Sequence, residues 1–264
     1  MLLPTIPRVP TEVNRAANSE FRKIIALRTG WWMPPVLAAV GFVATSVSAS
    51  VGSGPQERAA LATGTVTVGL YIAIAIAAVC GVWRGASLSG DEYRHHSISL
   101  TALSIPDRTL LFGAKVGVAA GYSVVSMLCA EAGALLALLA FGRGKAHFGW
   151  QLAGVFGGGL LAALCWGAIG AGLGLLLRST TLATIAVAGW LMLLEPLIWL
   201  VAKAAGVAGL VTLLPGSATV GTVAVGSFAD SPFLPPNAAS AVVLVLWTLA
   251  SGTAAWWYLR GREI

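Results

Sequence analysis

Six long apolar runs dominate the pattern of the chain, and they predict six membrane-spanning helices. The runs lie near residues 33–51, 64–82, 116–141, 152–177, 182–201 and 238–259. Each run is close to the roughly 20 residues that a helix needs to cross about 30 Å of hydrocarbon. The pattern therefore predicts an all-α integral membrane protein. We expect a single transmembrane domain over residues 12–264, after an irregular, proline-rich tail at residues 1–11.

An amphipathic segment, residues 12–31, precedes the first run. Phe21, Ile24 and Ile25 form an apolar stripe between basic residues, and Trp31 follows as an interfacial anchor. Such a segment is typical of a helix that lies on an anionic lipid surface. An ordinary solvated basic segment remains the alternative.

The most charge-dense internal stretch, residues 84–115, separates the second and third runs and is expected to be a polar loop. Within it, residues 97–105 can form a short helix with Ile98 and Ile105 on one side and Leu100 and Leu103 on another. Apolar groups that face two directions suit a groove on a partner. The sequence from Ser104 to Asp107 matches a capping box, which predicts that a new helix starts there and enters the third span.

The segment 202–237, before the last run, is too apolar for an exposed loop and too rich in proline and glycine for a span. Short re-entrant helices buried in protein would satisfy its backbone, which exposed coil in lipid cannot do. An ordinary surface loop is the alternative.

Composition supports the membrane assignment, since 57% of residues are hydrophobic, 10% are charged and the mean hydropathy is +0.85. The net charge of +6 comes from basic residues at the flanks of the apolar runs, so nucleic-acid binding is not expected. On one side of the predicted membrane lie Arg8, Arg15, Arg22, Lys23, Arg28, Arg84, Arg94, Arg108, Lys115, Arg178, Arg260 and Arg262. On the other lie Arg58, Arg143, Lys145 and Lys203. This bias predicts that both termini and the 84–115 loop are cytoplasmic. The high content of alanine, glycine and valine is typical of a bacterial protein, so the expected location is a bacterial plasma membrane.

The fourth run is crowded with glycine. Gly154 and Gly158 form one small-xxx-small pair, and Gly170 and Gly174 form another. Such pairs let helix backbones approach closely in lipid. We interpret this run as a helix-packing face.

Two carboxyl groups fall inside predicted spans, Glu131 in the third and Glu195 in the fifth. An intramembrane carboxyl is costly unless it has a partner or faces water. The two residues either line a translocation path or gate, or hold helices and the re-entrant segment together. Both interpretations remain open at this stage.

No catalytic, metal or nucleotide site is predicted. The three cysteines, Cys80, Cys129 and Cys165, lie inside apolar runs without metal-ligand spacing, and no span contains a histidine that could act as a base. A phosphate-binding loop is also missing. Energy for active transport would have to come from an ion gradient or from a separate ATPase.

Taken together, the amphipathic segment, the six spans, the loop between the second and third spans and the broken segment before the sixth resemble an ABC-2-type exporter permease. The most specific local likeness is Glu92, followed by the short apolar helix, then Pro106, Arg108 and Lys115. Many members of that family have Gly-Thr after the acidic residue, where this chain has His96-Ser97.

The resemblance implies an elbow helix at residues 12–31, a coupling helix docked in a cytoplasmic ATPase, and re-entrant helices before the last span. The residues implied to dock the ATPase are Glu92, Ser97, Ile98, Leu100, Thr101, Leu103, Pro106 and Arg108. Two ATPase subunits, which would bind ATP and magnesium, and a second permease copy, identical or related, are implied as partners. The cargo implied is an apolar or amphipathic compound such as a drug, lipid or lipopeptide.

Two other classes of function remain in competition with transport. A sensor or immunity protein could recruit a cytoplasmic partner through the same loop without moving anything. A membrane enzyme is disfavoured because the spans lack a nucleophile, base or metal constellation.

Overall fold

The computed structural model describes residues 11–55, 61–95, 107–228, 234 and 236–261, and within these ranges every regular element is a helix. Six helical stretches are long and apolar enough to cross a membrane. They are α2 (Arg28–Val51), α3 (Val68–Arg94) with the 3₁₀ turn η1 (Thr65–Thr67), α5 (Arg108–Phe141), α6 (Trp150–Leu177), α7 with α8 (Thr180–Ala204), and α10 (Asn237–Arg260). The architecture fits a multi-pass membrane protein, as the sequence predicted.

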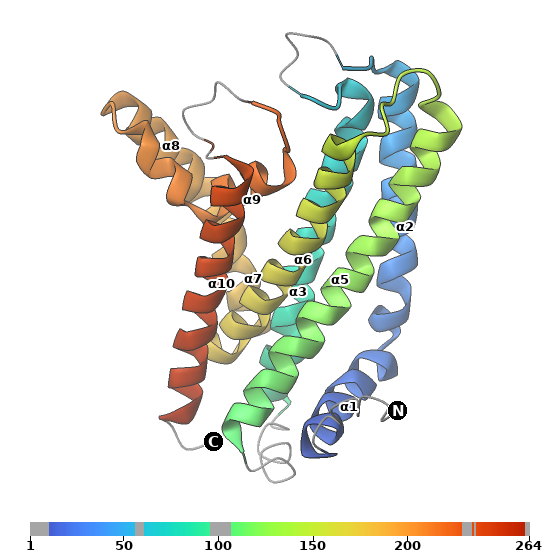
Figure 1. Ribbon diagram of the computed structural model, residues 1–264. Coiled ribbons are helices and arrows are strands. Elements are labelled where there is room, and N and C mark those ends of the chain that lie inside the picture. Colours follow the sequence, from blue (N-terminus) through green and yellow to red (C-terminus); the bar gives the residue numbers. More distant parts are fainter. Residues whose placement is uncertain (1–10, 56–60, 96–106, 229–233, 235, 262–264) are drawn as a thin grey trace, which may run out of the picture.

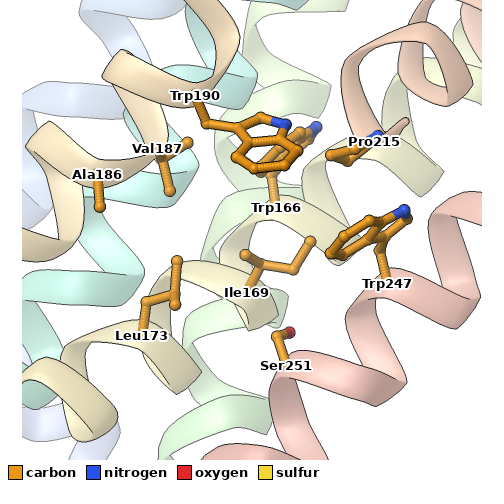
Figure 2. Close-up of a pocket in the computed structure, with 9 residues that line it drawn as sticks. All are labelled: Trp166, Ile169, Leu173, Ala186, Val187, Trp190, Pro215, Trp247 and Ser251. Atoms are coloured by element: carbon orange, nitrogen blue, oxygen red, sulfur yellow. The ribbon is translucent and has the colours of Figure 1, made fainter. Parts of the chain in front are cut away.

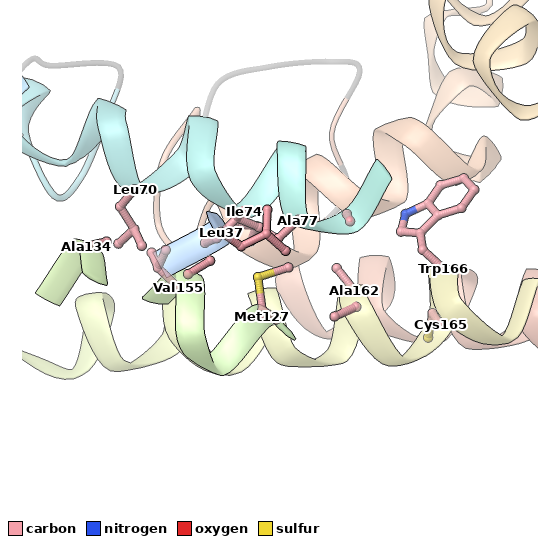
Figure 3. Close-up of a cluster of buried hydrophobic side chains, with 14 of the residues drawn as sticks. Leu37, Leu70, Ile74, Ala77, Met127, Ala134, Val155, Ala162, Cys165 and Trp166 are labelled. Carbon is pink, nitrogen blue, oxygen red and sulfur yellow. The ribbon is translucent and has the colours of Figure 1, made fainter. Parts of the chain in front are cut away.

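Helix α6 is the centre of the bundle. In its most apolar window 67% of the residues are buried, against 17% in α10. It packs on α3, α5 and α10, and Figure 1 shows α2 and α5 on one side of it and α7 and α10 on the other. Figure 3 shows the buried apolar cluster between these helices, with Ile74, Met127 and Val155 among its members.

A short helix, α1 (Thr11–Ala26), lies at the end of the bundle where α5 begins and α10 ends (Figure 1). The predicted single helix over residues 12–31 is wrong, because Leu27 is extended and a new helix, α2, starts at Arg28. The chain turns tightly here, since a Cβ at Gly30 would overlap the carbonyl oxygen of Ile24. Ile24 is buried, whereas Phe21 and Ile25 are exposed, so only part of the predicted apolar stripe packs on the bundle.

Helix α3 continues well beyond the predicted second span, to Arg94. The expectation of a polar loop from residue 84 is therefore wrong for residues 84–94. Protein contacts replace water around this stretch: Gly85 lies against the backbone of Gly167 in α6, and Gly90 against Thr180 in α7. A sequence pattern that records polarity alone does not show such contacts.

Helix α5 begins at Arg108, and Asp107 is its N-cap. The Asp107 side chain accepts hydrogen bonds from the backbone N–H groups of Thr109 (2.8 Å) and Leu110 (3.3 Å). Ser104, the predicted start, lies outside the described residues, and the extended backbone of Asp107 shows that α5 does not continue unbroken from a start at that position. An aspartate at the N-cap satisfies backbone donors that the helix leaves open.

The fifth span is interrupted. It consists of α7 (Thr180–Gly189), a π-helical segment η2 (Trp190–Leu194) and α8 (Glu195–Ala204), with Pro196 two residues after the end of the π segment. Proline has no N–H to donate to the preceding turn, which fits a local widening at this point. Beyond it lie η3 (Ala208–Leu213) and α9 (Pro215–Val223), and α9 packs on α6 and α10 (Figure 1).

Candidate functional site

A cavity of about 240 Å³ lies where α6, the π segment η2 and α10 meet. Figure 2 shows the indole rings of Trp166, Trp190 and Trp247 around it, one from each of these elements. Two of the indole N–H groups are engaged: Trp166 donates to Thr219 Oγ1 (3.0 Å) and Trp247 donates to the Leu213 carbonyl (2.8 Å). These bonds fix two of the rings, so the walls of the cavity are mainly rigid and apolar.

Two further cavities continue from the first along α9. Trp166 also lines a cavity of about 370 Å³ between α3, α8 and α9. That cavity shares Thr219 and Val220 with a third, of about 340 Å³, between α3 and α9. Individual ligand pockets typically measure about 300–1,000 Å³ and have apolar and aromatic walls. The row of cavities is therefore suited to an apolar ligand, and α9 is the element common to all three.

Glu195 holds the N-terminus of α9 in place. Its carboxylate accepts hydrogen bonds from the backbone N–H of Gly216 (3.0 Å), the backbone N–H of Ser217 (2.6 Å) and the Ser217 hydroxyl (3.2 Å). A carboxylate at this position satisfies open backbone donors and interacts favourably with the helix dipole. Of the two interpretations given above, the contacts support the structural one. Glu195 also borders the 370 Å³ cavity, so its position affects the shape of that cavity.

Glu131 is buried between α5 and α6. Its Oε1 atom lies against Gly159, where a side chain would overlap it, and has no hydrogen-bond partner among the described residues. Glu131 is not among the residues that line the three cavities above. Glu131 and Glu195 therefore do not line the same cavity.

A four-membered charge network joins α1, α3 and α5 at the end of the bundle. Lys115 lies 3.1 Å from Glu20 and 2.6 Å from Glu92, and Lys23 contacts the same two carboxylates. Lys115 is fully buried, and Glu20 is nearly so. Two carboxylates and two ammonium groups balance in charge, which is the usual condition for burying ions.

The residues implied to dock an ATPase fall into two groups. Glu92 belongs to the buried charge network, and the Arg108 guanidinium donates to the Leu259 carbonyl at the end of α10 (3.0 Å). Both therefore make contacts within the chain. The other six, Ser97, Ile98, Leu100, Thr101, Leu103 and Pro106, lie outside the described residues.

The four glycines of the two small-xxx-small pairs in α6 face two different neighbours. A Cβ at Gly170 or Gly174 would overlap the carbonyl oxygens of Val82 or Ala86 in α3. A Cβ at Gly158 would meet the backbone of α9, and one at Gly154 would meet the Val225 side chain. These four positions therefore lie at contacts of α6 with α3 and with the segment around α9.

Sequence reasoning missed the aromatic cavity and the role of Glu20. Tryptophan in membrane proteins is enriched near the membrane interfaces. The three cavity tryptophans lie inside apolar runs instead, and this unusual position was the signal that the sequence offered. For Glu20 the local sequence shows only the pairing with Lys23 three residues later, because its second partner, Lys115, is 95 positions away.

No protein-family model matches the chain, and no curated protein matches it either. Among the described residues there is also no group of histidine, cysteine, aspartate and glutamate side chains that could hold a metal ion.

Proposed function

We propose that the chain is the membrane-spanning subunit of an ATP-driven exporter of the ABC-2 type. In this proposal a separate cytoplasmic ATPase binds ATP and magnesium and docks on the segment between α3 and α5. The cargo is an apolar or amphipathic compound, and the working unit contains two ATPase subunits and a second permease copy.

The observation that carries the proposal is the mechanical connection at the end of the bundle. Helices α3 and α5 flank residues 95–107 and are ion-paired to each other through Glu92 and Lys115. Glu20 and Lys23 join α1 to the same cluster. A displacement of the connecting segment would therefore move α1, α3 and α5 together. A coupling helix docked in an ATPase needs such a connection to transmit the movement of the ATPase to the spans. In this proposal α1 corresponds to the elbow helix.

The path in this proposal runs beside α9. Helices α8 and α9 together with η3 correspond to the re-entrant segment. The cavities that border α9 are apolar, so a cargo molecule that leaves the lipid would meet a similar environment there. Because α3 lines two of these cavities, its movement would change their shape. The hydrogen bonds of Glu195 would hold the N-terminus of α9 against α8 during this movement.

The docking role can be tested by co-purification with an ATPase encoded next to this chain. We expect Leu100→Asp and Leu103→Asp to abolish co-purification, because a buried charge in an apolar contact is costly. Ser99→Asp is the matched control, since it adds the same charge in the same segment outside the implied contact. Membrane insertion should be equal in all three. Unchanged co-purification of both leucine variants would contradict docking at this segment.

Transport itself requires a flux measurement. Vesicles that hold the chain and its ATPase should accumulate a fluorescent apolar compound in an ATP-dependent manner, and a Walker-lysine variant of the ATPase should remove the signal. Docking without ATP-dependent flux of any compound tested would favour the sensor or immunity alternative over transport.

A further inference from the structure

The cavity of about 240 Å³ between α6, η2 and α10 borders the outer surface of the bundle near the middle of two spans. Figure 2 shows Ala186 on α7 and Trp247 on α10 at opposite sides of it. Both residues are exposed, Trp247 to 39%, and Trp247 lies about midway along α10. Because α7 and α10 belong to candidate spans, a compound dissolved in the hydrocarbon of the bilayer can reach the cavity directly.

The cavity offers a ligand no charge and no free hydrogen-bond donor. None of the residues that line it is charged. The indole N–H groups of Trp166 and Trp247 are engaged in the hydrogen bonds described above, and the Ser251 hydroxyl donates to the Thr248 carbonyl (3.0 Å). The Trp190 N–H is buried and is not presented to the cavity. A charged or strongly polar ligand would lose its hydration here without compensation.

The aromatic walls favour a ligand that is itself a ring. Trp190 and Trp247 pack against each other with ring centres 6.2 Å apart and planes at 55°, which is within the range of favourable aromatic pairs. A ligand ring would extend this packing. Indole faces also attract cations, but a buried cation needs a counter-charge, and no carboxylate lines this cavity. Glu195, in the neighbouring cavity, is already engaged with the start of α9.

The volume of the cavity limits the size of the ligand. An engineered apolar cavity of about 150 Å³ binds one benzene ring, and pockets for drug-sized ligands begin at about 300 Å³. A volume of about 240 Å³ lies between these values and corresponds to one or two fused rings. An acyl chain of a lipid is narrow enough to enter, but it loses more conformational freedom on binding than a rigid ring does.

We propose that this cavity binds an uncharged compound of one or two fused aromatic rings, which enters from the hydrocarbon between α7 and α10. That this compound is the transported cargo rests on the proposed function, whereas its binding requires neither ATP nor an ATPase. The site therefore narrows the cargo from apolar and amphipathic compounds in general to small uncharged aromatic ones.

Binding can be measured with the full-length chain in lipid nanodiscs, without ATPase, by equilibrium dialysis of radiolabelled naphthalene. We expect saturable binding of one naphthalene per chain, above the partitioning into empty nanodiscs. Ala186→Phe, which adds a ring at the edge of the cavity, should weaken binding by about tenfold because it takes the place of the ligand. Ala188→Phe is the matched control, since it adds the same ring at an exposed position of α7 that does not line the cavity.

A second pair of variants changes the wall itself. Trp247→Leu removes one aromatic face and should also weaken naphthalene binding. Trp257→Leu, in the same helix at a position that is 78% exposed, should bind as the wild type does. Absence of saturable binding to the wild type, or wild-type binding by both Ala186→Phe and Trp247→Leu, would overturn the proposal.

Three competitors test the chemistry of the ligand, each compared at equal concentration in the lipid. Naphthalene sulfonate and a naphthyltrimethylammonium ion carry the same rings with a charge and should not compete, and decalin, which is of similar size but not aromatic, should compete more weakly. Competition by either ion or by decalin equal to that of unlabelled naphthalene contradicts an uncharged aromatic site. Naphthalene binding without ATP-dependent flux supports the site and counts against transport, whereas flux of other compounds without saturable naphthalene binding overturns the site alone.

Discussion

Single glycines on α6 decide how closely α3 and α6 approach. Gly170 lies directly against the Val82 backbone, whereas Gly157, on the same helix, has no atom within 4 Å of where its Cβ would be. Backbone atoms cannot move aside as a flexible side chain can. The same substitution should therefore have different effects at the two positions.

We expect Gly170→Ala to lower the free energy of unfolding by roughly 1–3 kcal/mol, as overpacking at a tight contact does. Gly157→Ala should leave it unchanged or raise it slightly, because alanine favours helix. Thermal unfolding in detergent measures both. Equal effects of the two substitutions would show that α3 and α6 are not in backbone contact at Gly170.

Glu195 supports a second prediction at the residue scale. Glu195→Ala would leave the N–H groups of Gly216 and Ser217 without their acceptor and should cost roughly 1–3 kcal/mol. Hydrogen exchange at residues 216–219 should become faster in this variant, and Glu195→Gln, which keeps an acceptor oxygen, should show a smaller change. Exchange in α9 that does not respond to Glu195→Ala would mean that the carboxylate does not hold the helix.

At the scale of elements, the charge network fixes α1 against α3 and α5. Its contribution to stability depends on all four residues being present, because each of the two carboxylates is paired with both lysines. Lys115→Met should cost roughly 3–5 kcal/mol, because Glu20 and Glu92 would each lose the buried ammonium group and keep the pairing with the half-buried Lys23. Lys203→Met, at an exposed position, is the control. A Lys115→Met variant as stable as the wild type in thermal unfolding would contradict this account.

The same network predicts a pH dependence through Lys23, which lies in α1 outside the candidate spans. Burial lowers the pKa of Lys23, but hydrogen bonds to Glu20 and Glu92 and their negative charges outweigh it, so the pKa lies above the ordinary 10.5. A pKa raised in the folded state gives a stabilisation that is complete below the unfolded-state pKa and is lost as pH rises through the folded-state pKa.

The unfolding temperature should therefore differ between the wild type and Lys23→Met by a constant amount from about pH 6 to about pH 9, and the difference should shrink above about pH 10.5. Thermal unfolding across this range measures it. A difference that already falls between pH 6 and 9 would show that Lys23 is not held by the two carboxylates in the folded protein.

Two elements differ from their sequence-based prediction, for different reasons. The polar residues 84–94 were expected in a loop but are helical, because α6 and α7 cover Gly85 and Gly90 and Lys115 pairs with Glu92. Local polarity carries no information about such neighbours, which are distant in sequence. The fifth span was expected as one helix but contains a π segment just before Pro196, a local feature that hydropathy alone does not record.

At the scale of the whole molecule, the distribution of lysine and arginine predicts which side of the membrane each end faces. We expect Ser99→Cys, in a variant without native cysteines, to be protected from an impermeant thiol reagent in intact cells and labelled after permeabilisation. Arg143→Cys, in the connection after α5, should be labelled in intact cells. The opposite pattern would place the 95–107 connection outside the cell and remove the basis for a cytoplasmic ATPase.

The sequence alone determined the number of candidate spans, their approximate positions and the helical class, because each depends on the length and hydropathy of a continuous stretch. It also indicated that Glu131 and Glu195 are unusual, since a carboxyl in an apolar run needs an explanation wherever it lies. The tertiary structure decided what surrounds them: Glu195 caps a helix that starts 20 residues later, at Pro215, and Glu131 lies against Gly159. It likewise brought Glu20 to Lys115 and three tryptophans to one cavity. Hydropathy is a property of each segment by itself, whereas capping, ion pairing and cavity shape arise only when segments meet.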